Sequence, residues 1–471
     1  MPLVAGVDSS TSGCKVEIRD ADTGKLVSSG RAEHPPTTPP RSEQSPSDWW
    51  LAFERACASA DLGTHKIASI AVAAQQHGLV TLDKHGDVLR PAKLWNDTEA
   101  ASDSDELIHA LPTGAAAWAA ACGSVPLAAF TIAKLRWLRR CEPDRFARIG
   151  GVLLPHDWLT MQLTGRRTTD RGDASGTGYW SPAEGRYRLD LLALVDDDLD
   201  WEPLLPEVLS SREEAGRWET AGCAVAAGTG DNMAAALGLG LEPGDLVLSL
   251  GTSGTAYTVS DTPAADPSGV VAGFADATGR YLPLVCTLNA TKVTDTVARL
   301  LGISPAELDL LALGEAPGAD GLVLVPHLDG ERTPNRPSAT GTLHGLRSDA
   351  RREQVARAAI EGVVCNLLAG ADHLLDLVGG TRPARVILVG GGSRSMAYRH
   401  IVADLTGLPV LVPETDELVA RGAAVQAAAV LHQRSFTEIA DAWDLDAGTT
   451  IEPDFTVDRQ AIRAAYSTAS A

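Results

Sequence analysis

The chain has 471 residues, of which 44% are hydrophobic, so it can form ordinary packed cores and favours at least two domains. Its formal net charge of −21 argues against nucleic acid or an anionic membrane as a partner. We see no apolar stretch near the roughly 18 residues of a membrane span, and the N-terminal MPLVAGVD does not resemble a signal peptide. The scattered cysteines form no CxxC pair or zinc spacing, so we expect a cytoplasmic protein. For the oligomeric state we keep a homodimer as a hypothesis.

The first half of the chain predicts a three-stranded meander, a helix and a further strand. Alternating and continuous apolar runs, turn residues and helical spacing support this order. The Pro-rich segment HPPTTPPRSEQSP is expected to be a loop. The expected elements are strands at 3–8, 14–19 and 26–34, a helix at 47–60 and a buried strand at 66–75.

The second half repeats this pattern of meander, helix and strand, which indicates two related α/β domains. We place the boundary in the Gly- and Pro-containing stretch GLGLEPGD, giving domains 1–243 and 244–471. The expected elements are strands at 245–250, 255–261, 280–288, 321–328 and 385–390, and helices at 291–302, 353–380 and 417–433.

One tripeptide occurs at matching places in the two halves. Thr11-Ser12-Gly13 and Thr252-Ser253-Gly254 each interrupt a pair of strand-like runs. Such a turn exposes consecutive backbone N–H groups, which form a nest for phosphate oxygens. Either copy alone is also ordinary hairpin chemistry. Their matching positions favour two phosphate-binding turns that hold one polyphosphate from both sides.

Two carboxylates are candidates for chemistry. Asp231 follows the glycine turn of GTGDN and precedes an Ala-rich helix, so it is either a helix cap or a general base that takes a proton from a substrate hydroxyl. Asp8 ends the first strand, so it is either a turn residue or a ligand that organises the Mg²⁺ accompanying ATP.

Three further segments suit ligand binding. The glycines of VGGGSRS end a buried strand and could approach an adenine ring, or they form an ordinary turn; no GxGxxG or P-loop pattern is present. Gln76 and His77 follow a buried strand, where ligand sites of α/β proteins tend to lie. Trp95 in LWND could lie against a sugar, with a core position as the alternative, and DGERTP is expected to be a structural loop.

These segments together resemble the FGGY family of carbohydrate kinases, over nearly the whole chain and in the right order. Within that family, QQHG, LWND, GTGDN, LSLGTSG, GERTP and LLPHDWLTMQLTG are most similar to the kinases that act on D-xylulose. Departures from the family pattern occur at Ser10, Gln76 and Thr98. Gln76 and His77 replace the Arg-Glu pair of glycerol kinases, which argues against glycerol.

The resemblance implies two actin/hexokinase-like (ribonuclease H-like) ATPase domains with an interdomain cleft. It also implies that the N-terminal domain, 1–243, binds the sugar and that the C-terminal domain, 244–471, binds the nucleotide. It implies ATP-dependent phosphorylation of D-xylulose with Mg²⁺, and Asp231 as general base. Related acceptors such as ribulose or gluconate, and a non-catalytic actin-like nucleotide sensor, remain alternatives. The residues that match the family's motifs are, for the sugar, Gln76, His77, Asp231 and Asn232, for the nucleotide, Asp8, Thr11, Ser12, Lys15, Gly251, Thr252, Gly391 and Gly392, and for the metal, Asp8.

Overall fold

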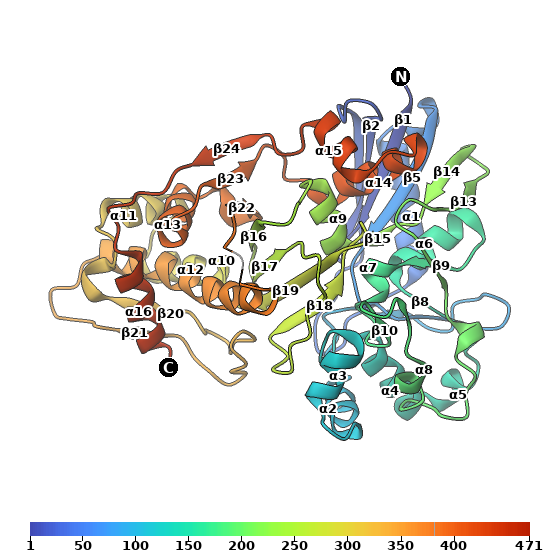
Figure 1. The fold of residues 1–471 in the computed structure, drawn as a ribbon, viewed down its shortest axis with the longest axis horizontal. Coiled ribbons are helices and arrows are strands. Elements are labelled where there is room, and N and C mark those ends of the chain that lie inside the picture. Colours follow the sequence, from blue (N-terminus) through green and yellow to red (C-terminus); the bar gives the residue numbers. More distant parts are fainter. Residues whose placement is uncertain (381) are drawn as a thin grey trace.

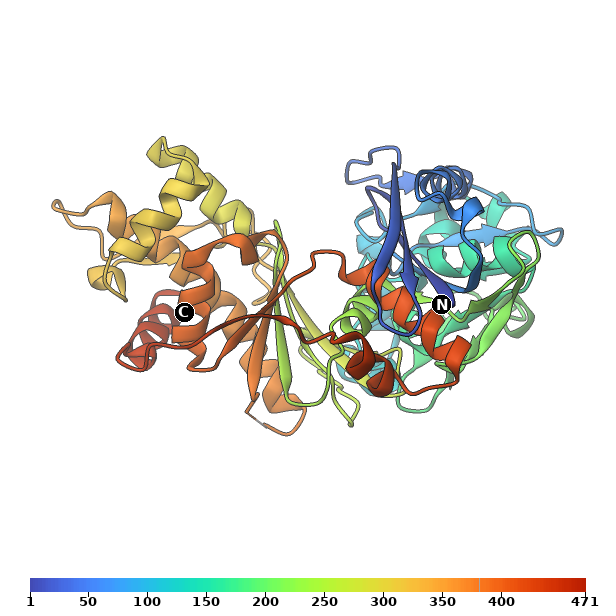
Figure 2. The same ribbon diagram turned by 90° about the horizontal axis from the view of Figure 1, so that it is seen from above.

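The protein consists of two lobes, each built around a seven-stranded sheet (Figures 1 and 2). The computed structural model describes residues 1–380 and 382–471. The two-domain α/β architecture expected from the sequence is confirmed. The meander, helix and strand predicted for each half are also present, although shorter strands between them were not predicted.

The sheet of the N-terminal lobe is buried on both faces because apolar residues fill both sides of its central strands. Ala5 and Val7 pack with Trp49 and Phe53 of the first helix, whereas Val4 packs with alanines of a helix from the far end of the chain. In spatial order the strands are β13 (Glu214–Trp218), β14 (Cys223–Ala226), β5 (Ile67–Ala74), β1 (Leu3–Ser9), β2 (Gly13–Asp20) and β3 (Leu26–Glu33), and β15 (Thr229–Gly230) also pairs with β5.

The sheet of the C-terminal lobe repeats the central arrangement. β16 is antiparallel to β17 and parallel to β22, just as β1 is antiparallel to β2 and parallel to β5. Both TSG turns therefore join a central strand to its antiparallel neighbour. In spatial order the strands are β18 (Val271–Ala275), β19 (Tyr281–Thr287), β17 (Gly254–Thr258), β16 (Asp245–Leu250), β22 (Arg385–Val389), β23 (Val410–Pro413) and β24 (Gly448–Ile451).

Helices cover these sheets, and short two-stranded ladders brace the loops. The helices of the N-terminal lobe are α1 (Pro46–Ser59), α2 (Ala101–Ala110), α3 (Ala115–Cys122), α4 (Thr131–Cys141), α5 (Pro143–Phe146), α6 (Pro155–Thr164), α7 (Arg171–Ala174), α8 (Leu189–Leu192) and α9 (Asp231–Gly238). Those of the C-terminal lobe are α10 (Thr291–Leu301), α11 (Pro305–Gly314), α12 (Arg352–Leu377), α13 (Met396–Thr406) and α16 (Arg459–Ala469). The ladders pair β4 (Glu43–Gln44) with β7 (Ala92–Lys93), β6 (Val80–Leu82) with β8 (Gly151–Leu153), β9 (Thr168–Asp170) with β12 (Glu207–Leu209), β10 (Trp180–Ser181) with β11 (Arg186–Tyr187), and β20 (Val323–Val325) with β21 (Thr342–His344).

Helix α12 corrects one expectation. Its most apolar window of 18 residues has a mean hydropathy of 1.3, so by length and composition this helix could cross a membrane. The expectation that no stretch approaches a membrane span is therefore wrong for α12. However, 78% of that window is buried inside the protein, where it packs on the C-terminal sheet.

Helices α14 (Leu418–His432) and α15 (Phe436–Trp443) come from the end of the chain but pack against the N-terminal sheet (Figure 1). α14 crosses α9 so closely that a Cβ atom at Gly422 would lie 1.7 Å from the carbonyl oxygen of Ala234. Only glycine permits this approach of two helix backbones. The proposed boundary between residues 243 and 244 stays a prediction. Helix α14 follows this boundary in the sequence, but it packs on the N-terminal lobe.

Candidate active site

The two TSG turns present unpaired backbone donors. In the first turn, Ser10 N donates to Gly13 O (3.0 Å), and in the second, Gly251 N donates to Ser253 O (3.0 Å). Within the described part of the chain, the N–H groups of the two residues at each tip donate to no other protein group; these residues are Thr11, Ser12, Thr252 and Ser253. Such consecutive free N–H groups are suited to bind phosphate oxygens.

The side chains of the first turn are held by neighbouring segments. Trp95 Nε1 donates to Thr11 Oγ1 (2.9 Å), and because an indole N–H can only donate, the Thr11 hydroxyl gives its proton to Gln75 Oε1 (2.9 Å). The Thr11 hydroxyl is thus already used, and its backbone N–H is the group left for a ligand. The ammonium of Lys15 contacts the carboxylate of Glu417 next to the start of α14.

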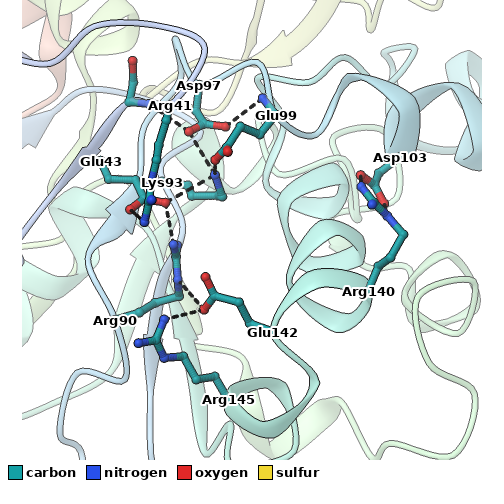
Figure 3. A network of polar contacts seen from close by, with 11 residues as sticks. Arg41, Glu43, Arg90, Lys93, Asp97, Glu99, Asp103, Arg140, Glu142 and Arg145 are labelled. Atoms are coloured by element: carbon teal, nitrogen blue, oxygen red, sulfur yellow. Dashed lines mark hydrogen bonds and ion pairs between the residues drawn. The ribbon is translucent and has the colours of Figure 1, made fainter.

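Trp95 is 46% exposed, so it does not occupy the core. It lies on a segment anchored by a buried ionic network (Figure 3). The Lys93 ammonium is fully buried, lies 3.0 Å from Asp97 and 2.5 Å from Glu99, and sits 3.8 Å above the ring of Trp137. These contacts fix the loop that carries Trp95 over the first turn.

Asp8 and Asp231 are the two carboxylates of the site. Asp231 is the first residue of α9, and its Oδ1 accepts the N–H of Asn232 (2.8 Å). Burial, together with the negative charges of Asp8 and Asp173, raises the pKa of Asp231 to about 7. Burial raises the pKa of Asp8 to about 6, although Lys15 partly offsets this shift. Asp8 Oδ1 is enclosed and has no hydrogen-bond partner within residues 1–380 and 382–471.

The structure brings Gln76 and Asn232 together although they are 156 residues apart. Asn232 Nδ2 donates to Gln76 Oε1 (2.7 Å), while Gln76 Nε2 is buried without a partner among the described residues. A buried unpaired amide costs about 1–3 kcal/mol unless water or a ligand bonds it. Gln76, Asn232 and Asp231 therefore form one polar group with donor capacity left for a ligand.

His77 lies in a left-handed backbone conformation, with φ of 65°. Its Nδ1 is 2.7 Å from Gly176 O, so this nitrogen carries the proton and Nε2 is the acceptor. Its ring packs against Phe130 and Phe274, whose rings also contact each other. Burial, followed by the charge of buried Lys134, lowers the pKa of His77 to about 3, so the imidazole is neutral.

Sequence reasoning missed a buried ionic cluster behind Asp231. His156 Nδ1 is 2.6 Å from Asp173 Oδ2, and its Nε2 is 3.2 Å from Asp157. Although burial alone lowers it, these carboxylates raise the pKa of His156 to about 9. Asp170 accepts the Thr229 hydroxyl (2.8 Å), which ties the cluster to the GTGD turn. The motif PHDW entered the sequence analysis only as part of the family resemblance, because nothing local indicates that His156 meets Asp173, 17 residues further on.

The glycine turn after β22 lies beside a hollow of about 140 Å³, lined by Gly390, Gly391, Arg394 and Asp416 among others. Gly391 is exposed with open space around it, as an approach to a flat ring requires. Gly392 is buried, and a Cβ atom there would lie 2.7 Å from Leu250. Packing therefore explains the glycine at position 392, and its contact with the nucleotide stays a prediction.

The GERTP loop was expected to be purely structural, and this expectation is incomplete. Glu331 is buried and structural, but Arg332 beside it is only partly buried. The charge of Arg332 contributes to the lowered pKa of His77, after burial and Lys134. The C-terminal lobe thus places a cation near the residues predicted to bind the sugar.

Comparison with known proteins identifies the family. The models of the N-terminal and C-terminal domains of the FGGY family of carbohydrate kinases match residues 3–238 and 246–431. The chain is 47% identical over 458 residues to xylulose kinase of Streptomyces coelicolor (96% of this chain, 92% of that protein) and 35% identical over 431 residues to xylulose kinase of Escherichia coli (86% and 85%). The crystal structure of xylulose kinase from Bifidobacterium adolescentis covers 100% of this chain and 99% of its own, at 38% identity and a TM-score of 0.88. This chain is a member of the FGGY family of carbohydrate kinases.

Proposed function

We propose that the protein transfers the γ-phosphoryl group of ATP to the terminal hydroxyl of D-xylulose, giving D-xylulose 5-phosphate and ADP. The observation that carries the proposal is the grouping of Asp231, Asn232, Gln76 and neutral His77, an uncharged hydrogen-bonding set beside one carboxylate of raised pKa. Such a set suits the hydroxyls of an uncharged ketose. The names of the relatives support the same acceptor.

ATP would be bound from both lobes. The free N–H groups of Thr11, Ser12, Thr252 and Ser253 would donate to its phosphates. Gly391 would border its adenine. Lys15 would contribute charge to the phosphates after exchanging its contact with Glu417.

Asp231 would act as the general base. The sugar hydroxyl oxygen attacks the γ-phosphorus and its proton passes to the Asp231 carboxylate. The bond between the γ-phosphorus and the β–γ bridging oxygen breaks, and ADP leaves with the electron pair. A base with a pKa near neutral is matched to this transfer, because about half of it is ionised at neutral pH and the ionised form accepts a proton readily.

Asp8 would bind the Mg²⁺ that accompanies ATP. Its enclosed, unpartnered Oδ1 fits a hard cation that prefers oxygen ligands, and its raised pKa is the expected state of a buried carboxylate without its counter-charge. When bound, Mg²⁺ supplies positive charge that offsets the charge of the phosphates.

A panel of acceptors tests this function. ADP release by the purified protein should be fastest with D-xylulose and much slower with ribulose, glycerol and gluconate. A preference for gluconate would mean that the protein is a gluconate kinase of the same family. The positive charge of Arg332, which acts on His77, would then explain the binding of the gluconate carboxylate. ADP binding without release on any sugar would favour a nucleotide sensor.

The pKa of Asp231 predicts an acidic limb in the pH profile. Since only the ionised carboxylate accepts a proton, kcat/KM for the sugar should fall about tenfold per unit as the pH drops below about 7. His77 stays neutral over this range and adds no limb of its own. Initial rates between about pH 5 and 9 measure the limb, with thermal unfolding at each pH as control. A flat profile down to about pH 5 in the folded protein would contradict the assignment of the base.

A further inference from the structure

The GERTP loop is held rigidly by one buried side chain. Glu331 is 1% exposed, and both of its carboxylate oxygens are used. Oε1 accepts the N–H groups of Leu288 (2.6 Å) and Arg332 (2.8 Å). Oε2 accepts the amides of Asn289 (2.8 Å) and Asn366 (3.1 Å). The backbone that carries Arg332 is therefore fixed to the segment after β19.

The segment after β19 is also hydrogen-bonded to the second TSG turn. Ala290 N donates to Thr252 O (3.1 Å), and Thr291 N donates to Gly251 O (2.9 Å). Asn289 also donates to Gly330 O (2.8 Å), at the start of the GERTP loop. A continuous hydrogen-bonded path thus fixes the position of Arg332 relative to the turn at Gly251-Thr252.

The guanidinium of Arg332 makes no hydrogen bond or ion pair with any of residues 1–380 and 382–471. It is only partly buried, so a ligand can reach it. The positive charge of Arg332 acts to lower the pKa of Cys286 in β19 and the pKa of His77 in the opposite lobe. The negative charge of Asp231 acts to raise the pKa of the same Cys286. The hydrogen-bonded path places the backbone of Arg332 close to the second TSG turn, and its unpaired guanidinium is free to bind a phosphoryl group held at that turn.

We propose that Arg332 is a further catalytic residue, whose guanidinium binds the phosphoryl group during its transfer from ATP to the sugar. This inference rests on the proposed function, because it assumes that a phosphoryl group crosses between the turns and Asp231. A planar guanidinium matches the geometry of phosphate oxygens, and arginines that reach a transferring phosphoryl group are worth factors of about 10³–10⁵ in GTPases.

The test replaces Arg332 by glutamine and by lysine. Arg332→Gln should lower kcat by at least about 100-fold, the loss typical for one positioned donor, with KM for the sugar little changed. Arg332→Lys keeps the charge without the fork and should recover part of the rate. Binding of ADP with aluminium fluoride, an analogue of the transferring group, should weaken in Arg332→Gln, whereas binding of ADP alone should not.

Arg336 on the same loop is the matched control. Its guanidinium bonds the carbonyl groups of Ser470 (2.6 Å) and Ala471 (3.2 Å), so Arg336→Gln should lower the melting temperature and leave kcat nearly unchanged. An unchanged kcat in Arg332→Gln, or a loss confined to the KM of the sugar, would overturn the proposal. If the wild-type protein phosphorylates no sugar, the proposed function fails, and the aluminium fluoride measurement still decides the role of Arg332.

Discussion

Replacing Asp231 by alanine is expected to lower kcat for sugar phosphorylation by about 10²–10⁴-fold while ATP binding stays largely intact. The carboxylate stands at the first residue of α9 with a pKa raised to about 7, beside Gln76 and Asn232. Without this carboxylate, the remaining residues proposed to bind the sugar offer no base of suitable pKa for the hydroxyl proton. The nucleotide is held by other residues, in the two turns, so its affinity should depend little on Asp231.

Asp231→Asn is the matched variant because it keeps the size of the side chain and removes only its basicity. The same loss of kcat in Asp231→Asn and Asp231→Ala would show that proton transfer, rather than packing, is at stake. Single-turnover ADP formation and nucleotide titration on the same samples separate chemistry from binding. Near-normal turnover in either folded variant would exclude Asp231 as the base.

His77→Ala should lower kcat/KM for D-xylulose by roughly 5- to 150-fold, which corresponds to about 1–3 kcal/mol for buried polar groups left unpaired. Because its Nδ1 faces Gly176 O, His77 offers Nε2 as the acceptor for a sugar hydroxyl. The slow hydrolysis of ATP without sugar should stay nearly unchanged, since water needs no such positioning.

Packing of the His77 ring complicates this variant, and two controls resolve it. Phe130→Leu disturbs the same aromatic contact without removing a polar group, so it reports the cost of packing alone. His77→Asn keeps a side chain that tolerates the left-handed backbone at this position. Both rates and the melting temperature should be measured for all three variants. If the two rates fall in parallel with lost stability, His77 has only a packing role.

The sequence by itself was sufficient for features that depend on neighbours along the chain. The apolar runs of β1, β5, β16 and β22, the matching TSG turns and the helix that begins at Asp231 all follow from local backbone preference and short-range periodicity. The motifs in their order were also sufficient for the family, because each is a short contiguous stretch.

Only the tertiary structure decided which distant groups meet and what charge each one carries. The pairing of Gln76 with Asn232, the His156–Asp173 cluster and the return of α14 onto the N-terminal lobe join residues that have no local signal for one another. Gly391 and Gly392 look alike in sequence, yet one is open and the other packs on Leu250. The sequence did not distinguish Arg332 from its neighbour Glu331, although Glu331 is buried and Arg332 is only partly buried. The physical reason is that burial and Coulomb interactions act through space, so the pKa values that distinguish Asp231 from an ordinary helix-starting aspartate exist only in the folded chain.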